Sequence, residues 1–488
     1  MTKLNPFSSS IRPALAGDRG AVSAAHPLAV AAGQQMLSLG GNAVDALIAA
    51  QAVLAVVAPD ACGVGGDAFV LLHDGREVIA VNGGGASPLA AREMATDGAQ
   101  SVTVPGLVDT WAMLAPRAIL GLAAALAPAI RIATHGFRID PGLALARDVQ
   151  KSRLLAGGAG DWPLTSAQVG SLLLQPELAR TLDRIACEGR AGLYAGPVAT
   201  EMIARVVAGG GALSHTDLAP SAATFEKPIT LSFRGHRVHV PPPASQGVLL
   251  AMVLNSWEAG NYDLANRDHI AVELTQAAFV HRDDVAHGVA LLTQPLEIDP
   301  AVASLKGGPR SYLHTAGVAV ADANGMVASS LVSVFDDFGS GVFLADSGFI
   351  LNNRGGGFTR GMNRFEPGKK PIHTLAPALI EGPDGTVALS TPGADGQVQT
   401  LLQVLLGWLA ADQDLAESVA APRWRSEDGA LLVEANHPAR DRLLTLGHRV
   451  RDTASGDMRF GAITAAGMEG QTPFALADWR RTTWAGVA

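Results

Sequence analysis

One threonine, Thr315, stands at the sharpest change of pattern in the chain. The segment before it, 296–314, contains prolines and paired glycines with little periodicity, and a strand-like pattern begins abruptly at Thr315. A loop that runs into a buried strand is typical of a linker between domains, and it is also typical of a processing site. If the chain were cut here, the hydroxyl of the new amino-terminal Thr could attack an amide while its freed α-amine acts as the base.

The short motifs that carry other nucleophiles, phosphates or metals are absent from the sequence. It has no Gly-x-x-x-x-Gly-Lys-Ser/Thr loop, no His-Glu-x-x-His helix and no Gly-x-Ser-x-Gly elbow. The 13 histidines show no metal-ligand spacing, and the glycine groups lack the context of a dinucleotide site. An amino-terminal nucleophile needs no histidine partner, because nucleophile and base share one residue. We expect no metal and no organic cofactor.

Helix-like and strand-like patterns alternate on both sides of this threonine. Helical spacing of apolar residues recurs in Ala-rich stretches at 28–39, 43–57, 122–133, 199–207 and 247–255. Strand-like runs lie at 68–73, 78–81, 229–233, 237–240, 317–322 and 327–334. Because small side chains let helices lie close to a sheet, the composition suits a layered α/β packing.

Composition excludes several classes of protein. The 488 residues include 36 basic and 45 acidic side chains, a net charge of −9 without a basic block, which argues against nucleic-acid binding. Two cysteines, Cys62 and Cys187, are too few for a disulfide framework, and we interpret both as small apolar thiols. No secretory signal is recognisable, and the longest apolar run, 46–58, is shorter than the ~20 residues that span a bilayer. We expect a cytoplasmic protein without a membrane partner.

Short motifs spread over most of the chain occur in an order that identifies a family. They include His26-Pro27-Leu28-Ala29, Gly40-Gly41-Asn42-Ala43-Val44-Asp45-Ala46, Gly63-Val64-Gly65-Gly66-Asp67-Ala68-Phe69, Pro241-Pro242-Pro243-Ala244-Ser245-Gln246-Gly247, Phe338-Gly339-Ser340-Gly341, Ile350-Leu351-Asn352-Asn353 and Gly447-His448. From about residue 20 to the end, the sequence thereby resembles the γ-glutamyltransferases, self-processing members of the N-terminal nucleophile hydrolases.

The resemblance implies a catalytic site around Thr315. The family cuts its chain before a Thr that leads into a strand ending in Val-Val-Asp, and counting back from Asp322 places the cut between His314 and Thr315. The family's second hydroxyl, which steadies the nucleophile and its amine, falls on Ser333. Its oxyanion hole uses two successive backbone N–H groups, which fall at Gly393-Ala394, where backbone donors tolerate an alanine.

The groups that hold a γ-glutamyl substrate elsewhere in the family are missing. The Arg that grips the α-carboxylate aligns with Gly84, and the Asp that holds the α-ammonium aligns with Gly357. Each such contact contributes roughly 1.5–3 kcal/mol, so their loss implies ~10²–10⁴-fold weaker binding of a γ-glutamyl group. The glycines could open the pocket, whereas Phe335, in place of an Asn, could narrow it or form an apolar wall. A paired Ser-Ser becomes His373-Thr374.

A subset of the family that includes oxamate amidohydrolase and related acylases is more similar. Its His-Thr-Leu, Asn-Arg-Gly and Asp-Gly-Gln elements stand here at 373–375, 353–355 and 395–397. We hypothesise that Arg354 holds a substrate carboxylate, since a guanidinium can grip one in a fork. The alternative is a structural pair with a nearby acid such as Asp336 or Asp337.

The predicted substrate-binding residues are Phe335, Asn353, Arg354, His373 and Thr374. His373 could polarise the substrate or simply form a hydrogen bond in the core. Asp395 could do no more than hold the turn behind the oxyanion hole.

The leading hypothesis is a self-cleaving amide hydrolase or acyltransferase that uses Thr315 on a small non-γ-glutamyl amide, either oxamate-like or an acyl amide. One alternative is a true γ-glutamyltransferase or glutathione hydrolase. Another is a catalytically silent binding protein, which His314 before the nucleophile and Ala316 after it leave open.

The fold implied by the resemblance is α+β, a four-layer αββα sandwich with Thr315 at the start of a central strand. Length alone suggests about three domains of ~150 residues. The resemblance instead implies one domain made of two interleaved segments, a large one (1–314) and a small one (315–488). These fragments would be each other's partners, and their heterodimer could form a homo-oligomer.

Overall fold

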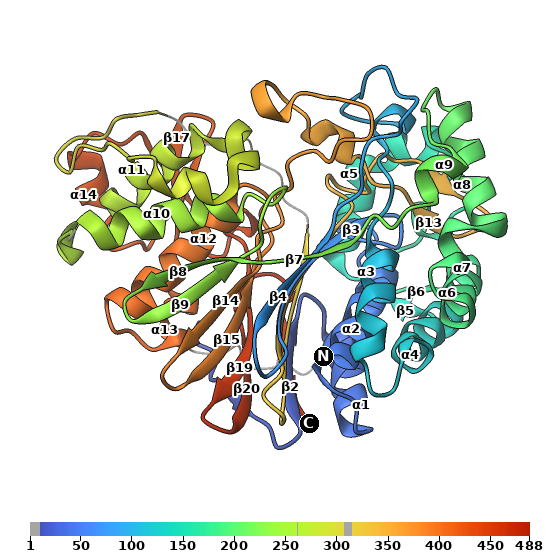
Figure 1. The fold of residues 1–488 in the computed structure, drawn as a ribbon, viewed down its shortest axis with the longest axis horizontal. Helices are drawn as coiled ribbons and strands as arrows, with labels where there is room; N and C mark the ends of the chain where they lie inside the picture. Colours follow the sequence, from blue (N-terminus) through green and yellow to red (C-terminus); the bar gives the residue numbers. More distant parts are fainter. Residues whose placement is uncertain (1–9, 261, 307–314) are drawn as a thin grey trace.

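Two stacked β-sheets form the centre of the molecule, and helices cover both outer faces (Figure 1). The computed structural model describes residues 10–260, 262–306 and 315–488. In Figure 1 the helices between residues 27 and 218 lie on one side of the sheets, and those between 247 and 445 lie on the other. This arrangement confirms the expected four-layer αββα sandwich.

The sheet that carries Thr315 is called sheet B, and all its neighbouring strands are antiparallel. Its hydrogen-bonded order is β21 (Trp484–Val487), β2 (Gly20–Ala24), β10 (Ala316–Asp322), β11 (Val327–Ser333), β3 (Asp67–His73), β4 (Val78–Gly83) and β7 (Thr224–Glu226). Strands from both sides of the predicted cleavage point therefore pair within one sheet.

The second large sheet, sheet A, is also antiparallel. Its order is β1 (Leu15–Ala16), β20 (Thr472–Ala477), β19 (Thr464–Glu469), β15 (Gly385–Ser390), β14 (Ala378–Gly382), β9 (His236–Val240) and β8 (Ile229–Phe233). Most side chains that fill the space between the two sheets are alanines, among them Ala319, Ala388 and Ala466. Such small side chains let the two sheets approach closely, whereas the Ala-rich composition had suggested only that helices lie close to a sheet.

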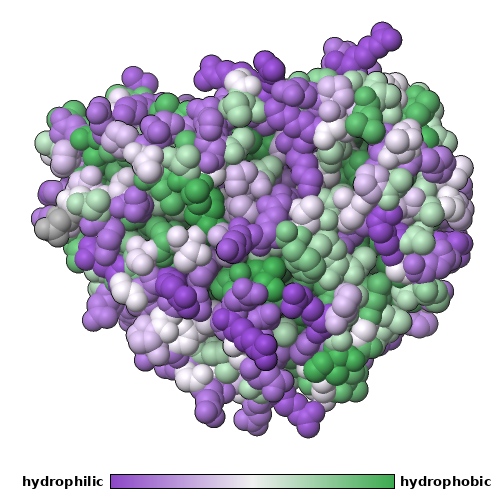
Figure 2. All heavy atoms as spheres, in the orientation of Figure 1, coloured by the Kyte–Doolittle hydropathy of each residue, from purple (hydrophilic) through white to green (hydrophobic). Residues whose placement is uncertain are grey.

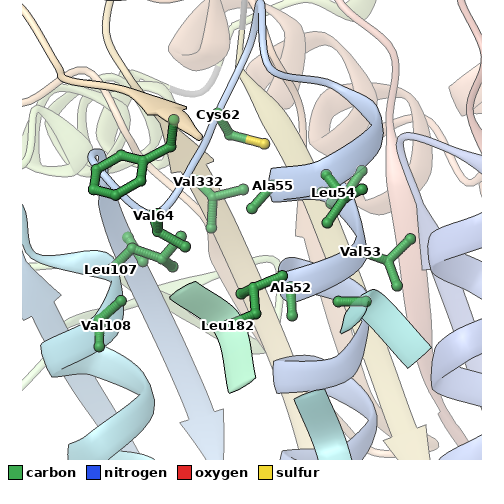
Figure 3. Close-up of a cluster of buried hydrophobic side chains, with 14 of the residues drawn as sticks. Ala52, Val53, Leu54, Ala55, Cys62, Val64, Leu107, Val108, Leu182 and Val332 are labelled. Atoms are coloured by element: carbon green, nitrogen blue, oxygen red, sulfur yellow. The ribbon is translucent and has the colours of Figure 1, made fainter. Parts of the chain in front are cut away.

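Helix α2 (Ala43–Val57) shows how the sequence builds the layer over sheet B. Asn42 accepts hydrogen bonds from the first turn and Asp45 reaches back to the Asn42 amide, which together make a capping box at the start of the helix. All of its residues are buried, because the helix packs on β10 and β11 and against α1 (Pro27–Ser38) and α4 (Leu122–His135). Figure 3 shows this core, in which Leu54 of α2, Val332 and Cys62 lie together.

The layer over sheet A includes α10 (Gly247–Gly260), α11 (Arg267–Phe279) and α12 (Gly396–Leu405). The remaining helices are α3 (Leu107–Leu114), α5 (Pro141–Ala156), α6 (Pro176–Glu188), α7 (Ala191–Tyr194), α8 (Gly196–Ala208), α9 (His215–Leu218), α13 (Leu415–Ala420) and α14 (Arg440–Thr445). The smaller sheets are β5 (Phe137–Arg138) with β6 (Leu172–Leu173), β12 (Phe343–Leu344) with β13 (Phe349–Ile350), and β16 (Trp424–Glu427), β17 (Ala430–Glu434) and β18 (Val450–Thr453).

The helical and strand-like stretches predicted from the sequence all fall in elements of the predicted type, with ends that shift by a few residues. The described part of the irregular segment, 296–306, contains neither helix nor strand, and its remainder, 307–314, lies outside the described residues. Cys62 is buried as expected, but Cys187 is exposed at the surface of α6. The apolar interpretation therefore applies to Cys62 alone.

Polar and apolar side chains are interspersed on the face seen in Figure 2. Among the described helices, none combines the length and the apolar character that crossing a membrane requires.

Candidate active site

The register of sheet B brings three polar residues to one end of neighbouring strands. Ala316, directly after Thr315, pairs with Val332 of β11. The next residue of β11, Ser333, pairs with Asp67 of β3. Because neighbouring strands lie about 4.8 Å apart, Thr315, Ser333 and Asp67 stand in a row at the same edge of the sheet.

The two predicted catalytic hydroxyls face each other. Thr315 is 5% exposed, and its Oγ1 lies 3.5 Å from Ser333 Oγ. The backbone N–H of Phe335 donates to the same Ser333 oxygen at 3.0 Å, which holds the serine side chain in place. Ser333 is therefore positioned to contact the hydroxyl of Thr315.

The predicted oxyanion loop joins β15 to α12. Gly393 and Ala394 both have positive φ, +124° and +50°. Their carbonyl oxygens accept hydrogen bonds from Arg425 Nη1 (3.1 Å) and Gln246 Nε2 (3.0 Å), respectively. Within the described residues, no acceptor takes the N–H of Gly393 or of Ala394. Two N–H groups without acceptors, just before the start of a helix, are suited to stabilise an oxyanion.

A buried charged cluster completes this end of sheet B. Arg354 Nε donates to Asp67 Oδ2 at 3.1 Å, and both side chains are fully buried. His373 Nε2 lies 3.1 Å from the same oxygen. The ring of Phe335 lies over the Arg354 guanidinium, 4.4 Å from its central carbon. Three of the five predicted substrate-binding residues thus meet around Asp67, which was not among them.

The acid that pairs with Arg354 is not one of the two anticipated from the sequence. Asp336 instead accepts a hydrogen bond from Asn353 Nδ2 at 2.7 Å. Burial raises the pKa of the Asp336 carboxyl, although the Asn353 hydrogen bond and the charge of Arg354 oppose this shift. Asp67 was not considered because it is 287 positions from Arg354, and only strand register brings the two together.

His373 is neutral at physiological pH. Its burial, with the positive charge of Arg354 adding to the effect, lowers its pKa to about 4. A neutral imidazole next to a carboxylate donates its Nε2–H to that carboxylate, so we assign this proton to Nε2. His373 also packs against Phe69, with ring centroids 4.5 Å apart. The core hydrogen bond considered for His373 is therefore present.

The two glycines that replace the family's charged groups do not open a pocket, contrary to expectation. A Cβ at Gly84 would lie 3.1 Å from His373 Cδ2 and 3.3 Å from Phe69 Cε2. A Cβ at Gly357 would lie 3.0 Å from the Ile372 carbonyl oxygen. The space beside each glycine is already occupied by neighbouring atoms.

The other predicted residues shape the surrounding loops. Asn353 Oδ1 accepts the Asp336 N–H at 3.0 Å. The Thr374 carbonyl accepts from Gln246 Nε2 at 3.0 Å, and the same amide bonds to the oxyanion loop. Asp395 pairs with Arg282 Nε at 2.9 Å, beside that loop. Gln246 lies within the motif at 241–247. Its link between Thr374 and Ala394 could not be inferred from the sequence, because it depends on tertiary contacts.

A cavity of about 260 Å³ reaches the nucleophile, and Thr315 and Pro392 of the oxyanion segment both line it. Two carboxylates, Asp60 and Asp140, and the side chain of Arg481 also line this cavity. A small molecule could therefore reach Thr315 from this side. His314, the residue predicted to precede the cut, lies outside the described residues.

Comparison with known proteins agrees with this geometry. The γ-glutamyltranspeptidase family model matches residues 29–488. The glutathione hydrolase-like YwrD proenzyme of Bacillus subtilis is 32% identical over 84% of this chain and 85% of its own length. The oxamate amidohydrolase proenzyme of Klebsiella pneumoniae is 32% identical over 88% of this chain and 91% of its own.

Among solved structures, cephalosporin acylase from Bacillus halodurans superposes with a TM-score of 0.91 at 28% identity, and the match covers 100% of this chain and 99% of that one. Sequence and fold lead to the same result. The chain belongs to the γ-glutamyltranspeptidase family.

Proposed function

We propose that this protein is a self-processing amide hydrolase or acyltransferase whose nucleophile is Thr315 and whose substrate is a small amide other than a γ-glutamyl compound. The proposal rests mainly on the arrangement of residues at one end of the central strands of sheet B. Thr315 faces Ser333 across the β10–β11 pair, and it lines the same cavity as Pro392, which directly precedes the two residues whose N–H groups have no acceptor in the described structure.

The first step is self-cleavage of the chain, which gives Thr315 a free amine. Thr315 Oγ1 attacks the carbonyl carbon of His314, the bond to the Thr315 nitrogen breaks, and that nitrogen takes the proton. Water then hydrolyses the ester, which leaves a carboxylate on His314 and a free amine on Thr315. Ser333 supports this step because its Oγ lies 3.5 Å from the attacking oxygen.

The second step repeats this attack on a substrate. Thr315 Oγ1 attacks the substrate carbonyl while the Thr315 amine accepts its proton, and the N–H groups of Gly393 and Ala394 stabilise the oxyanion. The leaving amine takes the proton from Thr315. Water or a second amine then releases the acyl group from the Thr315 ester.

The surroundings of Asp67 support a non-γ-glutamyl substrate. Gly84 and Gly357 supply no charge, and neighbouring atoms fill the space beside them. Arg354 contacts Asp67 through Nε, and a guanidinium is a group that can grip a carboxylate in a fork. We propose that Asp67 orients this guanidinium toward a substrate carboxylate, as in oxamate or another acidic amide.

A gel and an activity assay test the proposal. Purified wild-type chain should convert to fragments of 314 and 174 residues, and Thr315→Ala should remain intact. Thr315→Ser, which keeps a hydroxyl, is the matched control and should still be cut. A wild-type chain that stays whole on long incubation would refute the enzyme and favour a silent binding protein.

The substrate is tested separately on the cleaved protein. Hydrolysis of oxamate and simple acyl amides should exceed hydrolysis of γ-glutamyl-p-nitroanilide. Efficient turnover of the γ-glutamyl compound would contradict our interpretation of Gly84 and Gly357 and identify a true γ-glutamyltransferase.

A further inference from the structure

A second group of buried polar side chains lies in the helical layer over sheet A. His269 and Glu273 are one turn apart on α11, and His448 follows α14. Their exposed fractions are 2%, 0% and 4%, respectively. One ring nitrogen from each histidine and one oxygen of Glu273 all lie within 4.8 Å of one another. Three ligand-type atoms therefore converge in a space closed to solvent.

Backbone groups hold two of these three side chains. His269 Nε2 lies 3.1 Å from the Asp299 carbonyl oxygen, so it must donate its proton there. The lone pair of His269 Nδ1 then faces His448 Nε2 at 2.7 Å. The Ser304 N–H donates to Glu273 Oε2 at 3.1 Å. The side chains of His269 and Glu273 are thus held by backbone groups, and each has a ligand-type atom within 4.8 Å of a ring nitrogen of His448.

One carboxylate oxygen in this group has no hydrogen-bond donor next to it among the described residues. Among the described residues, Glu273 Oε1 has no hydrogen-bond partner although the side chain is fully buried. A buried carboxylate oxygen without a partner is strongly unfavourable, so another group is expected next to it. A cation at this point would satisfy the oxygen and would use the lone pairs of both rings.

We propose that His269 Nδ1, His448 Nε2 and Glu273 Oε1 bind a divalent transition-metal ion, and that Zn²⁺ fits them best. Two imidazoles and a carboxylate form a ligand set that zinc commonly takes, with water in a fourth position. The Asp299 carbonyl is the kind of outer partner that fixes a metal-binding imidazole. When the ion binds, the hydrogen shared by the two ring nitrogens leaves His448 Nε2 and the ring takes the tautomer protonated on Nδ1, so His448 stays neutral.

The site would join parts of the chain that the predicted cleavage separates. His269 and Glu273 precede the cleavage point and His448 follows it. Asp299 and Ser304 belong to the segment that leads toward residues 307–314, and Ala303 N–H also donates to the Leu446 carbonyl at 2.8 Å. The ion would thus tie the end of the large segment to the small one, away from Thr315.

Metal titration of the full-length chain tests this site without using activity. After treatment with a chelator, the wild-type protein should bind one Co²⁺ per chain with visible absorption, and Zn²⁺ should displace it. Zn²⁺ should also raise the temperature of unfolding. Glu273→Gln and His448→Gln should each weaken Co²⁺ binding at least tenfold, whereas His287→Gln, which alters an exposed histidine, should leave it unchanged.

Two results would overturn the site. The first is a wild-type chain that binds no stoichiometric Co²⁺ or Zn²⁺, which would leave a hydrogen-bonded histidine pair. The second is equal binding by wild type and Glu273→Gln, which would place the ion elsewhere. The wild-type titration is decisive even if His448→Gln does not fold.

Discussion

Two buried ionic clusters in this molecule each pair arginine with a carboxylate, and they differ in how many hydrogen bonds the carboxylate oxygens accept. In the cluster near the C-terminus, Arg423 pairs with Asp478 and Arg480 pairs with Glu434, both at 2.6 Å. Each oxygen of these two carboxylates accepts at least two hydrogen bonds. The arginine charges hold the pKa of Asp478 below its usual value although burial opposes this.

The cluster beside Thr315 is less complete. Asp67 receives both Arg354 and His373 on Oδ2, and within the described chain neither its Oδ1 nor His373 Nδ1 has a partner. Incomplete pairing costs stability, so an incompletely paired cluster next to the proposed nucleophile favours a role in binding. We infer that the C-terminal cluster serves the fold and the Asp67 cluster serves the substrate.

The largest expected effect tests the C-terminal cluster. Asp478→Asn leaves Arg423 and Arg480 short of charge in the core and should reduce the free energy of unfolding by about 3–5 kcal/mol. The kcat of the molecules that remain folded should not change. Urea unfolding and an active-site-normalised assay measure the two quantities, and a loss below about 1 kcal/mol would contradict the structural role.

Replacing the Asp67–Arg354 pair should lower activity toward the substrate, which replacing Asp478 should not do. A double variant, Asp67→Leu with Arg354→Met, removes both charges together but leaves His373 Nε2–H without its acceptor, so stability should fall by about 1–3 kcal/mol. The kcat/KM for an acidic amide should fall about 100-fold, equivalent to about 2.7 kcal/mol.

The single variant Arg354→Met sharpens this prediction. It should raise KM for acidic substrates more than for neutral acyl amides. An unchanged KM for both kinds of substrate would indicate that the role of Arg354 is purely structural.

The pH dependence of stability isolates His373. Its pKa is about 4 in the folded chain and near 6.5 when unfolded, so the unfolded state binds more protons between these values. The stabilisation is complete above about pH 6.5 and is lost as pH falls toward 4. Between pH 7 and pH 5, wild type should lose about 2 kcal/mol more stability than His373→Gln. Parallel pH curves for the two proteins would contradict the neutral, buried imidazole.

The smallest effect concerns the filled space beside Gly84. Gly84→Ala would press its Cβ toward His373 and Phe69 and should cost about 1 kcal/mol. Gly160→Ala, whose Cβ would meet nothing within 4 Å, is the control. Gly84→Arg should not create γ-glutamyl activity. Gain of that activity would show that the pocket can accommodate the family's arginine after all.

Local patterns were sufficient for much of the fold near the site. Ala43–Val57 carries its own cap, and the runs that became β3, β10 and β11 have apolar patterns that a sheet buried on both faces requires. Many strands of sheet A were not predicted, because short segments such as β14 and β19 are recognisable as strands only beside their neighbours.

The sequence by itself determined the family, the position of Thr315 at the entry to a strand and the absence of charges at positions 84 and 357. Only the tertiary structure decided which acid holds Arg354 and what fills the space beside Gly84, and it alone brought His269 to His448. These partners lie far apart in sequence, as with the 179 positions between the two histidines. The physical reason is that strand register and side-chain packing, which no local pattern records, determine which distant polar groups meet.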